Sequence, residues 1–412
     1  MAARHRHRAA GWEVAMDLTS SVADEEFRQQ VRQWLAENLV GEFAGLRGLG
    51  GSGREHEAFE ARVAWNRHLA AAGWTCLGWP VEFGGRGLSL FQQVIFHEEY
   101  ARADAPARVN HLGEELLGPT LIAHGTDEQR ARFLPGIAAA TELWCQGYSE
   151  PDAGSDLASV RTRARLDGDQ WVIDGQKVWT SLAQQADWCF AVVRTDPGSR
   201  RHAGLSYLLV PMDQPGVQVR PIVQLTGTSE FNEVFFDGAR TAADLVVGAP
   251  GDGWRVAMAT LGFERGVSTV GQQVGFAREL DAVVAEARRT GAVDDPVLAD
   301  RLARARLGLE VLRTHAMRTL SAHDTGSAEP VSSSAASVSK LLWGRWHRDL
   351  GELAMAVRGT AGLTVAEPPY GLDRLQALYL FSRADTIYGG SDEIQRNIIA
   401  ERVLGLPKEP RG

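Results

Sequence analysis

The 412-residue chain has only three cysteines, and no stretch approaches 18 uninterrupted apolar residues. Cys76, Cys145 and Cys189 are scattered and form no CxxC pair, so we expect no disulfide framework and a reducing, cytoplasmic location. The lack of a long apolar run predicts no membrane-spanning helix. No HExxH motif or Cys/His ligand spacing occurs, so we expect no metal site.

Lysine supplies only three of the 43 basic residues, and the acidic residues number 52. The resulting net charge of −9 argues against non-specific nucleic-acid binding as the main role. With 44% apolar and 23% charged residues, the composition is that of a globular protein. The length indicates two or three domains. We interpret residues 1–16, which are rich in Arg and His and lack an apolar segment, as a loose tail rather than a secretory signal.

The hydrophobic pattern divides the rest of the chain into three segments. Residues 17–143 have helical periodicity, and residues 255–412 predict long amphipathic helices that pack as an antiparallel bundle. Residues 144–254 contain short β-prone runs punctuated by Gly, Pro and Asp, which predict an antiparallel sheet domain. The fold class is therefore α+β, mostly helical, and not the alternating βαβ of a Rossmann domain. Apolar residues spaced three or four apart include Phe27, Val31, Leu35, Leu298, Leu302, Ala305, Leu309 and Leu312.

Three short patterns match known motifs but lack the required context. Gly48–Gly53 fits GxGxxG but follows a helix, so we interpret it as a loop. Ser337–Lys340 fits SxxK without an SDN or KTG partner, and we expect its serine to cap a helix. His97, Glu98 and Glu99 lie in a helical stretch with no second histidine at metal spacing, which favours a solvated or locally paired face.

Four separated segments carry the chemistry of the chain. They are Trp144–Asp156 (WCQGYSEPDAGSD), Asp174–Ser181 (DGQKVWTS), Gly262–Arg265 (GFER) and Ile387–Asn397 (IYGGSDEIQRN). In this order they resemble the acyl-CoA dehydrogenase family of flavoproteins, and the resemblance extends from about residue 20 to about residue 408. It implies an N-terminal helical domain, a middle β domain and a C-terminal four-helix bundle, with FAD held between the last two.

The resemblance also implies the cofactor contacts. A flavin needs hydrogen-bond partners along its pyrimidine edge and at N5, which the stretch from Gln146 to Ser149 can supply. Trp179 can form a wall against the ring, and the plain alternative is a core aromatic of the β domain. The expected FAD-binding residues are Gln146, Tyr148, Ser149, Gly154, Ser155, Trp179, Thr180, Ser181, Arg358, Gly359, Ser391 and Glu393.

The implied reaction needs a base for the α proton and hydrogen bonds to the thioester oxygen. Many family members carry a Glu directly after the Tyr of the fourth motif, but this chain has Gly389 there, and glycine cannot take a proton. A minority carry the Glu before an Arg on the first long bundle helix, which points to Glu264 and Arg265. We therefore expect Glu264 to be the base and the Gly389 N–H to bind the thioester oxygen. The expected substrate contacts are Ser155, Arg265, Tyr388 and Gly390.

The plain alternatives are a local ion pair for Glu264 and an ordinary surface arginine at position 265. Two family segments that reach the cofactor are also altered, because Arg288–Gly291 and Ala356–Thr360 depart from Arg-x-x-Phe-Gly and Gln-x-x-Gly-Gly. The resemblance thus leaves open how the FAD diphosphate and adenine are held. It also leaves open whether the chain forms a homodimer, a homotetramer or a heteromer.

The sequence predicts FAD-dependent α,β-dehydrogenation of an acyl thioester of coenzyme A or a carrier protein, with electrons passing to an electron-transfer flavoprotein or a similar acceptor. A flavin oxidase or monooxygenase on the same scaffold, or a non-catalytic subunit of a heteromeric dehydrogenase, are the alternatives. The shape of the acyl pocket depends on polar residues that either meet an oxygenated acyl chain or face water, and we expect water. These residues are Asn110, His111, Glu114 and Glu115.

Overall fold

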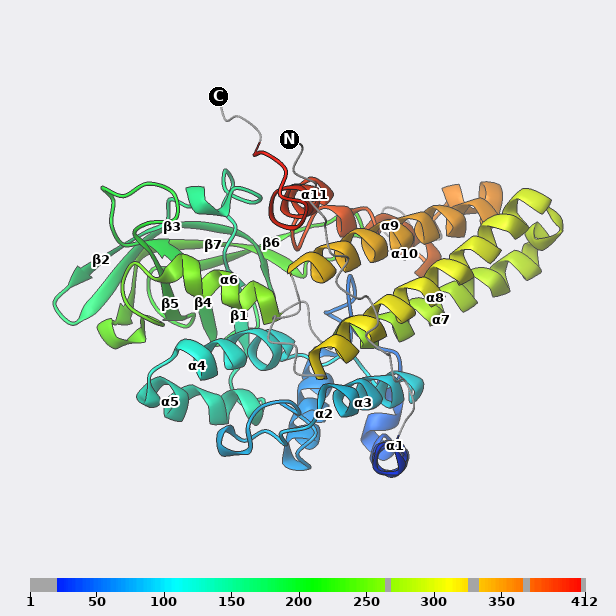
Figure 1. The fold of residues 1–412 in the computed structure, drawn as a ribbon, viewed down its shortest axis with the longest axis horizontal. Coiled ribbons are helices and arrows are strands. Elements are labelled where there is room, and N and C mark those ends of the chain that lie inside the picture. Colours follow the sequence, from blue (N-terminus) through cyan, green and yellow to red (C-terminus); the bar gives the residue numbers. More distant parts are fainter. Residues whose placement is uncertain (1–20, 264–267, 325–332, 366–370, 409–412) are drawn as a thin grey trace, which may run out of the picture.

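The computed structural model describes residues 21–263, 268–324, 333–365 and 371–408. Helices form the N-terminal and C-terminal parts of the chain and a seven-stranded sheet lies between them in sequence, which confirms the predicted fold class. In Figure 1 the sheet occupies one side of the molecule, and the long helices of the C-terminal part extend away from it. Across the described ranges, no helix is both long and apolar enough to cross a membrane.

The N-terminal part begins with a helix whose start and buried face agree with the sequence pattern. The Ser21 hydroxyl accepts a hydrogen bond from the backbone N–H of Asp24, and Phe27, Val31 and Leu35 are buried. Gly48–Gly53 lies outside any helix or strand, as expected of a loop. The helices are α1 (Val22–Asn38), α2 (Phe59–Ala71), α3 (Leu90–Arg102), a π-helical segment (Leu112–Leu117), α4 (Gly118–His124) and α5 (Asp127–Ala138).

The middle part is a mixed sheet in the order β1-β4-β2-β3-β7-β6, with β5 paired to β4. Most pairings are antiparallel, whereas β4 pairs in parallel with β1 and β2. The apolar runs beginning at Trp171, Trp188, Leu205 and Val217 all fall in strands, as expected. The strands are β1 (Trp144–Gly147), β2 (Arg163–Asp167), β3 (Gln170–Ser181), β4 (Trp188–Arg194), β5 (Leu205–Pro211), β6 (Val217–Ile222) and β7 (Phe231–Ala242).

The C-terminal part packs α7, α8, α9 and α10 around one apolar core, which includes Phe276, Leu309 and Leu353. At the far end of this bundle the Thr290 hydroxyl of α7 donates to the carbonyl of Val357 of α9, at 2.8 Å. The helices are α6 (Gly253–Phe263), α7 (Ser268–Thr290), α8 (Pro296–Asp324), α9 (Ser333–Arg358), α10 (Arg374–Phe381) and α11 (Asp392–Ile398). Shorter helical turns are Gly41–Leu46, Val81–Phe83, Leu157–Ser159, Ala243–Leu245, Ala292–Asp294, Gly359–Leu363, Ala384–Thr386 and Ile399–Val403.

The expected cap at Ser337 is wrong. Helix α9 begins at Ser333, so Ser337 lies inside the helix, where it is fully buried. Its hydroxyl has no hydrogen-bond partner among the described residues, whereas Lys340 donates to the backbone carbonyl of Asp385, at 2.5 Å. The SxxK pattern is therefore part of the packing between α9 and the segment before α11.

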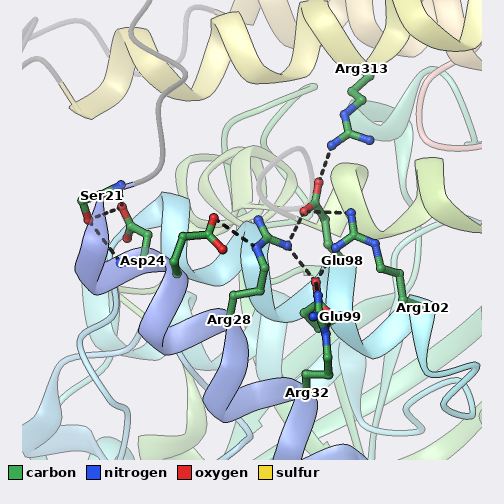
Figure 2. A network of polar contacts seen from close by, with 9 residues as sticks. Ser21, Asp24, Arg28, Arg32, Glu98, Glu99, Arg102 and Arg313 are labelled. Carbon is green, nitrogen blue, oxygen red and sulfur yellow. Dashed lines mark hydrogen bonds and ion pairs between the residues drawn. The ribbon is translucent and has the colours of Figure 1, made fainter.

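The N-terminal helices are joined to the bundle by a network of arginines around two buried glutamates, shown in Figure 2. Arg28 of α1 donates to Glu98 and Glu99 of α3, at 2.9 and 2.8 Å, and Arg313 of α8 donates to Glu98, at 2.8 Å. Glu99 also pairs with Arg32 and Arg102. The sequence favoured a solvated or a locally paired face for these glutamates. The solvated alternative is wrong, because both side chains are buried. The pairing is mostly long-range, with Arg102 as the partner from the same helix.

Candidate active site

A buried ion pair holds the end of β1 against β3. Lys177 donates to the Glu150 carboxylate at 2.7 Å and to the carbonyls of Tyr148 and Val192 at 3.1 and 2.7 Å. Burial lowers the pKa of Lys177. Burial alone would raise the pKa of Glu150, but Lys177 outweighs it and lowers that pKa. The Val178 N–H also donates to the carbonyl of Ser149. These contacts bring the first two motifs side by side.

The second motif contains an irregularity that turns Trp179 outward. The pairing of β3 with β7 shifts between Lys177 and Thr180, and Trp179 adopts a φ of +59°. Its indole is 57% exposed and contacts the ring of Phe231 edge-on. A large aromatic side chain left this open is not a core residue, so the core alternative for Trp179 is wrong. The indole offers a flat apolar surface to a planar ligand.

Two polar side-chain atoms of the first two motifs are buried without a hydrogen-bond partner among the described residues. They are the hydroxyl of Thr180 and the amide nitrogen of Gln146. Leaving such a group unsatisfied costs roughly 1–3 kcal/mol, which a ligand can recover. Ser149 and Ser181 are half-buried near them, and Gly154 and Ser155 lie exposed in the following turn. An open aromatic face and unsatisfied polar atoms in the same two motifs fit the ring and pyrimidine edge of a flavin.

The loop that carries Tyr388 is fixed by a chain of polar groups centred on the buried His347 and Asp385. The Tyr388 hydroxyl donates to Asp385 at 2.7 Å, and the same carboxylate contacts Nδ1 of His347 at 2.5 Å. Nε2 of His347 lies 2.7 Å from the Glu279 carboxylate. Burial alone would lower the pKa of His347, but the two carboxylates raise it to about 9, so the imidazolium form is held at neutral pH. Helices α7 and α9 thereby set the position of this loop.

The two glycines after Tyr388 have backbone conformations that other residues rarely adopt. Gly389 has a φ of +64° and Gly390 a φ of +89°. A Cβ at Gly390 would also lie 2.3 Å from the side-chain nitrogen of Gln395. The backbone therefore provides a physical reason for glycine at position 389, where many relatives carry the catalytic glutamate.

The structure does not bring all the expected cofactor residues together. Arg358 ends α9 at the tip of the bundle and is held by Glu286 and Asp373. Helix α7 spans 23 residues, roughly 34 Å, and its last turn lies at this same tip (Figure 1). Arg358 and Gly359 are therefore remote from Trp179 within one chain. Ser391 and Glu393 instead lie at the start of α11, lining an open charged groove of about 550 Å³.

A second hollow, of about 420 Å³, lies between the N-terminal helices and the end of α6. Its volume is in the range of small-molecule sites. Phe263, the last residue described before Glu264, lines it. Glu264 and Arg265 themselves lie outside the described residues. The expectation that the nearby polar residues face water is wrong for two of them, since Asn110 and Glu114 are 1% and 2% exposed.

The comparisons with known proteins identify the class. Family models described as the N-terminal, middle and C-terminal domains of acyl-CoA dehydrogenase match residues 21–141, 145–239 and 251–404. The chain therefore belongs to the acyl-CoA dehydrogenase family, and it is an enzyme of this oxidoreductase class.

Among individual proteins, the chain is similar to two curated relatives, each named acyl-CoA dehydrogenase IpdE1. It is 69% identical to that of Mycobacterium tuberculosis (strain H37Rv) and 66% identical to that of Mycolicibacterium smegmatis, covering 94% of this chain and 99% of each relative. A structure titled Tcur3481-Tcur3483 steroid ACAD is 31% identical, with a TM-score of 0.82 over 96% of this chain and 100% of that one. The ChsE4-ChsE5 complex of Mycobacterium tuberculosis is 30% identical, with a TM-score of 0.77 and the same coverage.

The sequence interpretation missed the contribution of α3 and the segment before the π-helix to the hollow. His97 and Arg108 line it, although neither was assigned to a site. A signal was present for His97, a histidine beside two acidic residues in an amphipathic helix. Nothing in the local pattern places Arg108 next to α3, because this contact depends on the packing of segments that are distant in sequence.

Proposed function

We propose that the chain catalyses the FAD-dependent α,β-dehydrogenation of an acyl thioester. Coenzyme A is the favoured carrier, because both IpdE1 relatives are named acyl-CoA dehydrogenases. The same names favour dehydrogenation over the oxidase or monooxygenase alternative. The observation that carries the proposal is that the first two motifs hold both the open face of Trp179 and the unsatisfied groups of Gln146 and Thr180.

In this proposal Trp179 would cover one face of the flavin, and Gln146, Thr180 and the stretch through Ser149 would bind its polar edge. FAD, when bound, supplies the acceptor for the hydride that leaves the β carbon. Glu264 takes the α proton as the α C–H bond breaks, and a C=C bond forms between the α and β carbons. The Gly389 N–H donates to the thioester oxygen, which stabilises the negative charge that develops there.

The hollow next to Phe263 is proposed as the acyl pocket, since Glu264 follows Phe263 directly in the chain. When a substrate fills this mostly apolar hollow and excludes water, the pKa of a carboxylate there rises toward that of an effective base at neutral pH. Arg265, Ser155, Tyr388 and Gly390 remain the proposed substrate contacts. The steroid ACAD title of one structural relative supports a bulky carbocyclic acyl group as the substrate.

Anaerobic mixing of the purified, FAD-loaded protein with a panel of acyl-CoA thioesters tests the proposal. A substrate bleaches the visible band of the oxidised flavin. We expect Glu264→Gln to retain FAD and substrate binding but to slow bleaching by at least 100-fold, because an amide cannot accept the α proton. Glu310→Gln, an exposed glutamate on α8, is the matched control and should bleach at the normal rate. A Glu264→Gln protein with full turnover refutes the assignment of the base.

A second candidate is a subunit of a heteromeric dehydrogenase. Two structural relatives carry titles that name pairs of different chains, Tcur3481-Tcur3483 and ChsE4-ChsE5. The remote placement of Arg358 and Gly359 from Trp179 also favours a cofactor site shared between chains. The FAD-to-protein ratio of the chain purified alone distinguishes the two, since one FAD per chain argues against a silent subunit.

The electron acceptor is proposed to be an electron-transfer flavoprotein or a similar carrier. A cytoplasmic location is proposed from the three cysteines, which are all free and buried. The described residues contain no group of three or more His, Cys, Asp or Glu side chains that could hold a metal.

A further inference from the structure

The hollow proposed as the acyl pocket has one wall unlike the rest. Most of its lining is apolar, from Cys76 to Pro80, from α4 and from Phe263. The rest of the lining is largely polar and comes from α3, the residue Arg108 and the π-helical segment. A pocket for a plain hydrocarbon chain gains nothing from such a wall, because buried polar groups without ligand partners cost free energy.

The polar wall is built around the guanidinium of Arg108. It donates to the carboxylate of Glu114 and to that of Glu115, both at 2.8 Å. Glu114 also accepts from the amide of Asn66, at 3.0 Å, and its side chain is 1% exposed. The Glu115 side chain is 30% exposed and lines the hollow. Glu114 thus anchors Arg108, while Glu115 offers a carboxylate oxygen toward the cavity.

His97 is a further polar group on this wall. It lines the hollow from α3, and no hydrogen bond joins its ring to any described residue. Gly271 of α7 packs directly against it, since a Cβ there would lie 3.3 Å from the His97 Cβ. Burial and the charge of Arg108 lower the pKa of His97 to about 4, so the ring is neutral at pH 7. A neutral imidazole has one N–H to donate and one lone pair to accept.

The charges of the wall decide which ligand group it fits. The ion pair of Arg108 and Glu115 is internally compensated. Burial alone would raise the pKa of Glu115, but Arg108 holds it below the ordinary value. Burial raises the pKa of Glu114, and its carboxyl group offers no positive charge to an anion. A carboxylate on the acyl group would meet the negative charge of Glu115. A neutral hydroxyl or ketone finds hydrogen-bond partners here instead.

We propose that His97, Arg108 and Glu115 form a polar subsite of the acyl pocket that selects acyl groups bearing a hydroxyl or ketone. This inference rests on the proposed function, because it takes the hollow to be the acyl pocket. A hydroxyl donates to Glu115 and accepts from His97 or Arg108, and a ketone accepts from the same donors. The three residues are specificity determinants and take no part in the proton or hydride transfer.

The test compares the FAD-loaded protein's affinity for cyclohexanepropanoyl-CoA with its affinity for the 3-hydroxy, 4-hydroxy and 4-oxo derivatives, by calorimetry and by anaerobic flavin bleaching. We expect the best oxygenated ligand to bind at least tenfold more tightly than the parent compound. His97→Leu and Glu115→Leu should each bring this ratio toward one, without weakening the binding of the parent compound. Ile122→Val, which changes an apolar residue of the same hollow outside the polar wall, should affect all ligands alike.

Two results overturn the subsite. One is an oxygenated-to-parent ratio near one in the unaltered protein. The other is a high ratio that both His97→Leu and Glu115→Leu leave unchanged. Failure to bind any of these thioesters also overturns it, because the hollow is then not an acyl pocket for them. Failure of the proposed function looks different, since selective binding would then persist without any bleaching of the flavin.

Discussion

At the scale of single residues, Lys177 shows how a buried charge can position a binding site. The Lys177 side chain is fully buried, and its partner Glu150 also accepts the backbone N–H groups of Arg161 and Thr162, at 2.6 and 2.9 Å. These contacts fix the segment between Gln146 and Trp179. The pair therefore links the stability of the sheet to the shape of the flavin site.

Lys177→Met should destabilise the protein by about 3–5 kcal/mol, because it leaves the Glu150 carboxylate buried without its counter-ion. Urea denaturation measures the loss, and flavin retention on dilution measures the effect on the site. The double variant Lys177→Met/Glu150→Gln removes the stranded charge and should recover part of the stability. If the single variant were as stable as the unaltered protein, the pair would have no role in holding β1 against β3.

The sequence was sufficient to predict residues whose role follows from a contiguous motif. Trp179, Gln146 and Thr180 stand in two such motifs, which the pair of Lys177 and Glu150 joins. It was not sufficient for Arg358 and Gly359, which the structure places at the remote tip of the bundle. It also failed for Asn110 and Glu114, expected to face water, because their burial depends on packing against α2 and α5.

At the scale of elements, the periodic pattern predicted the long helices and most strands, since their buried faces repeat over several turns or pairs. Strands β1 and β2 were missed because they are only four and five residues long. The π-helical turn over Leu112–Leu117 leaves no signal in apolar spacing either. It lies at the hollow, in keeping with the frequent use of such turns at functional sites.

The contact between α7, α9 and the loop before α11 should make stability depend on pH. The groups facing His347 are Glu279 and Asp385, and Lys340 contacts the backbone of Asp385. The folded pKa of His347, about 9, lies above its ordinary value of 6.5. The contribution of His347 to the free energy of unfolding is therefore fully present below pH 6.5. It is lost as the pH rises toward 9, and the total loss is about 3 kcal/mol.

Urea midpoints measured between pH 6 and pH 9.5 check this pH dependence. The unaltered protein should lose stability over that range, and His347→Gln should be less stable at pH 6 but show a flatter profile. His315→Gln is the comparison variant, because its ring contacts a backbone carbonyl and no carboxylate. Identical slopes for His347→Gln and the unaltered protein would rule out His347 as the titrating group.

At the scale of the whole molecule, the arginine network of Figure 2 decides how firmly the N-terminal helices are held to the bundle. Its arginines differ sharply in burial, since the side chain of Arg28 is 16% exposed and that of Arg313 is 52% exposed. Both contact Glu98, which is 5% exposed. The Glu98 carboxylate thus has one partner, Arg28, that is largely shielded from water, and another, Arg313, whose charge is screened by water.

Arg28→Met should cost about 3 kcal/mol, because it withdraws the shielded counter-ion from Glu98 and Glu99 at once. Arg313→Met should cost less than about 1 kcal/mol, as expected of an exposed ion pair, although it is the contact that reaches α8. Added salt should weaken the second effect more than the first. Urea unfolding at low and high salt measures both. Equal losses for the two variants would mean that burial does not set the strength of this domain contact, and that the bridge to α8 matters as much as the buried pairs within the N-terminal helices.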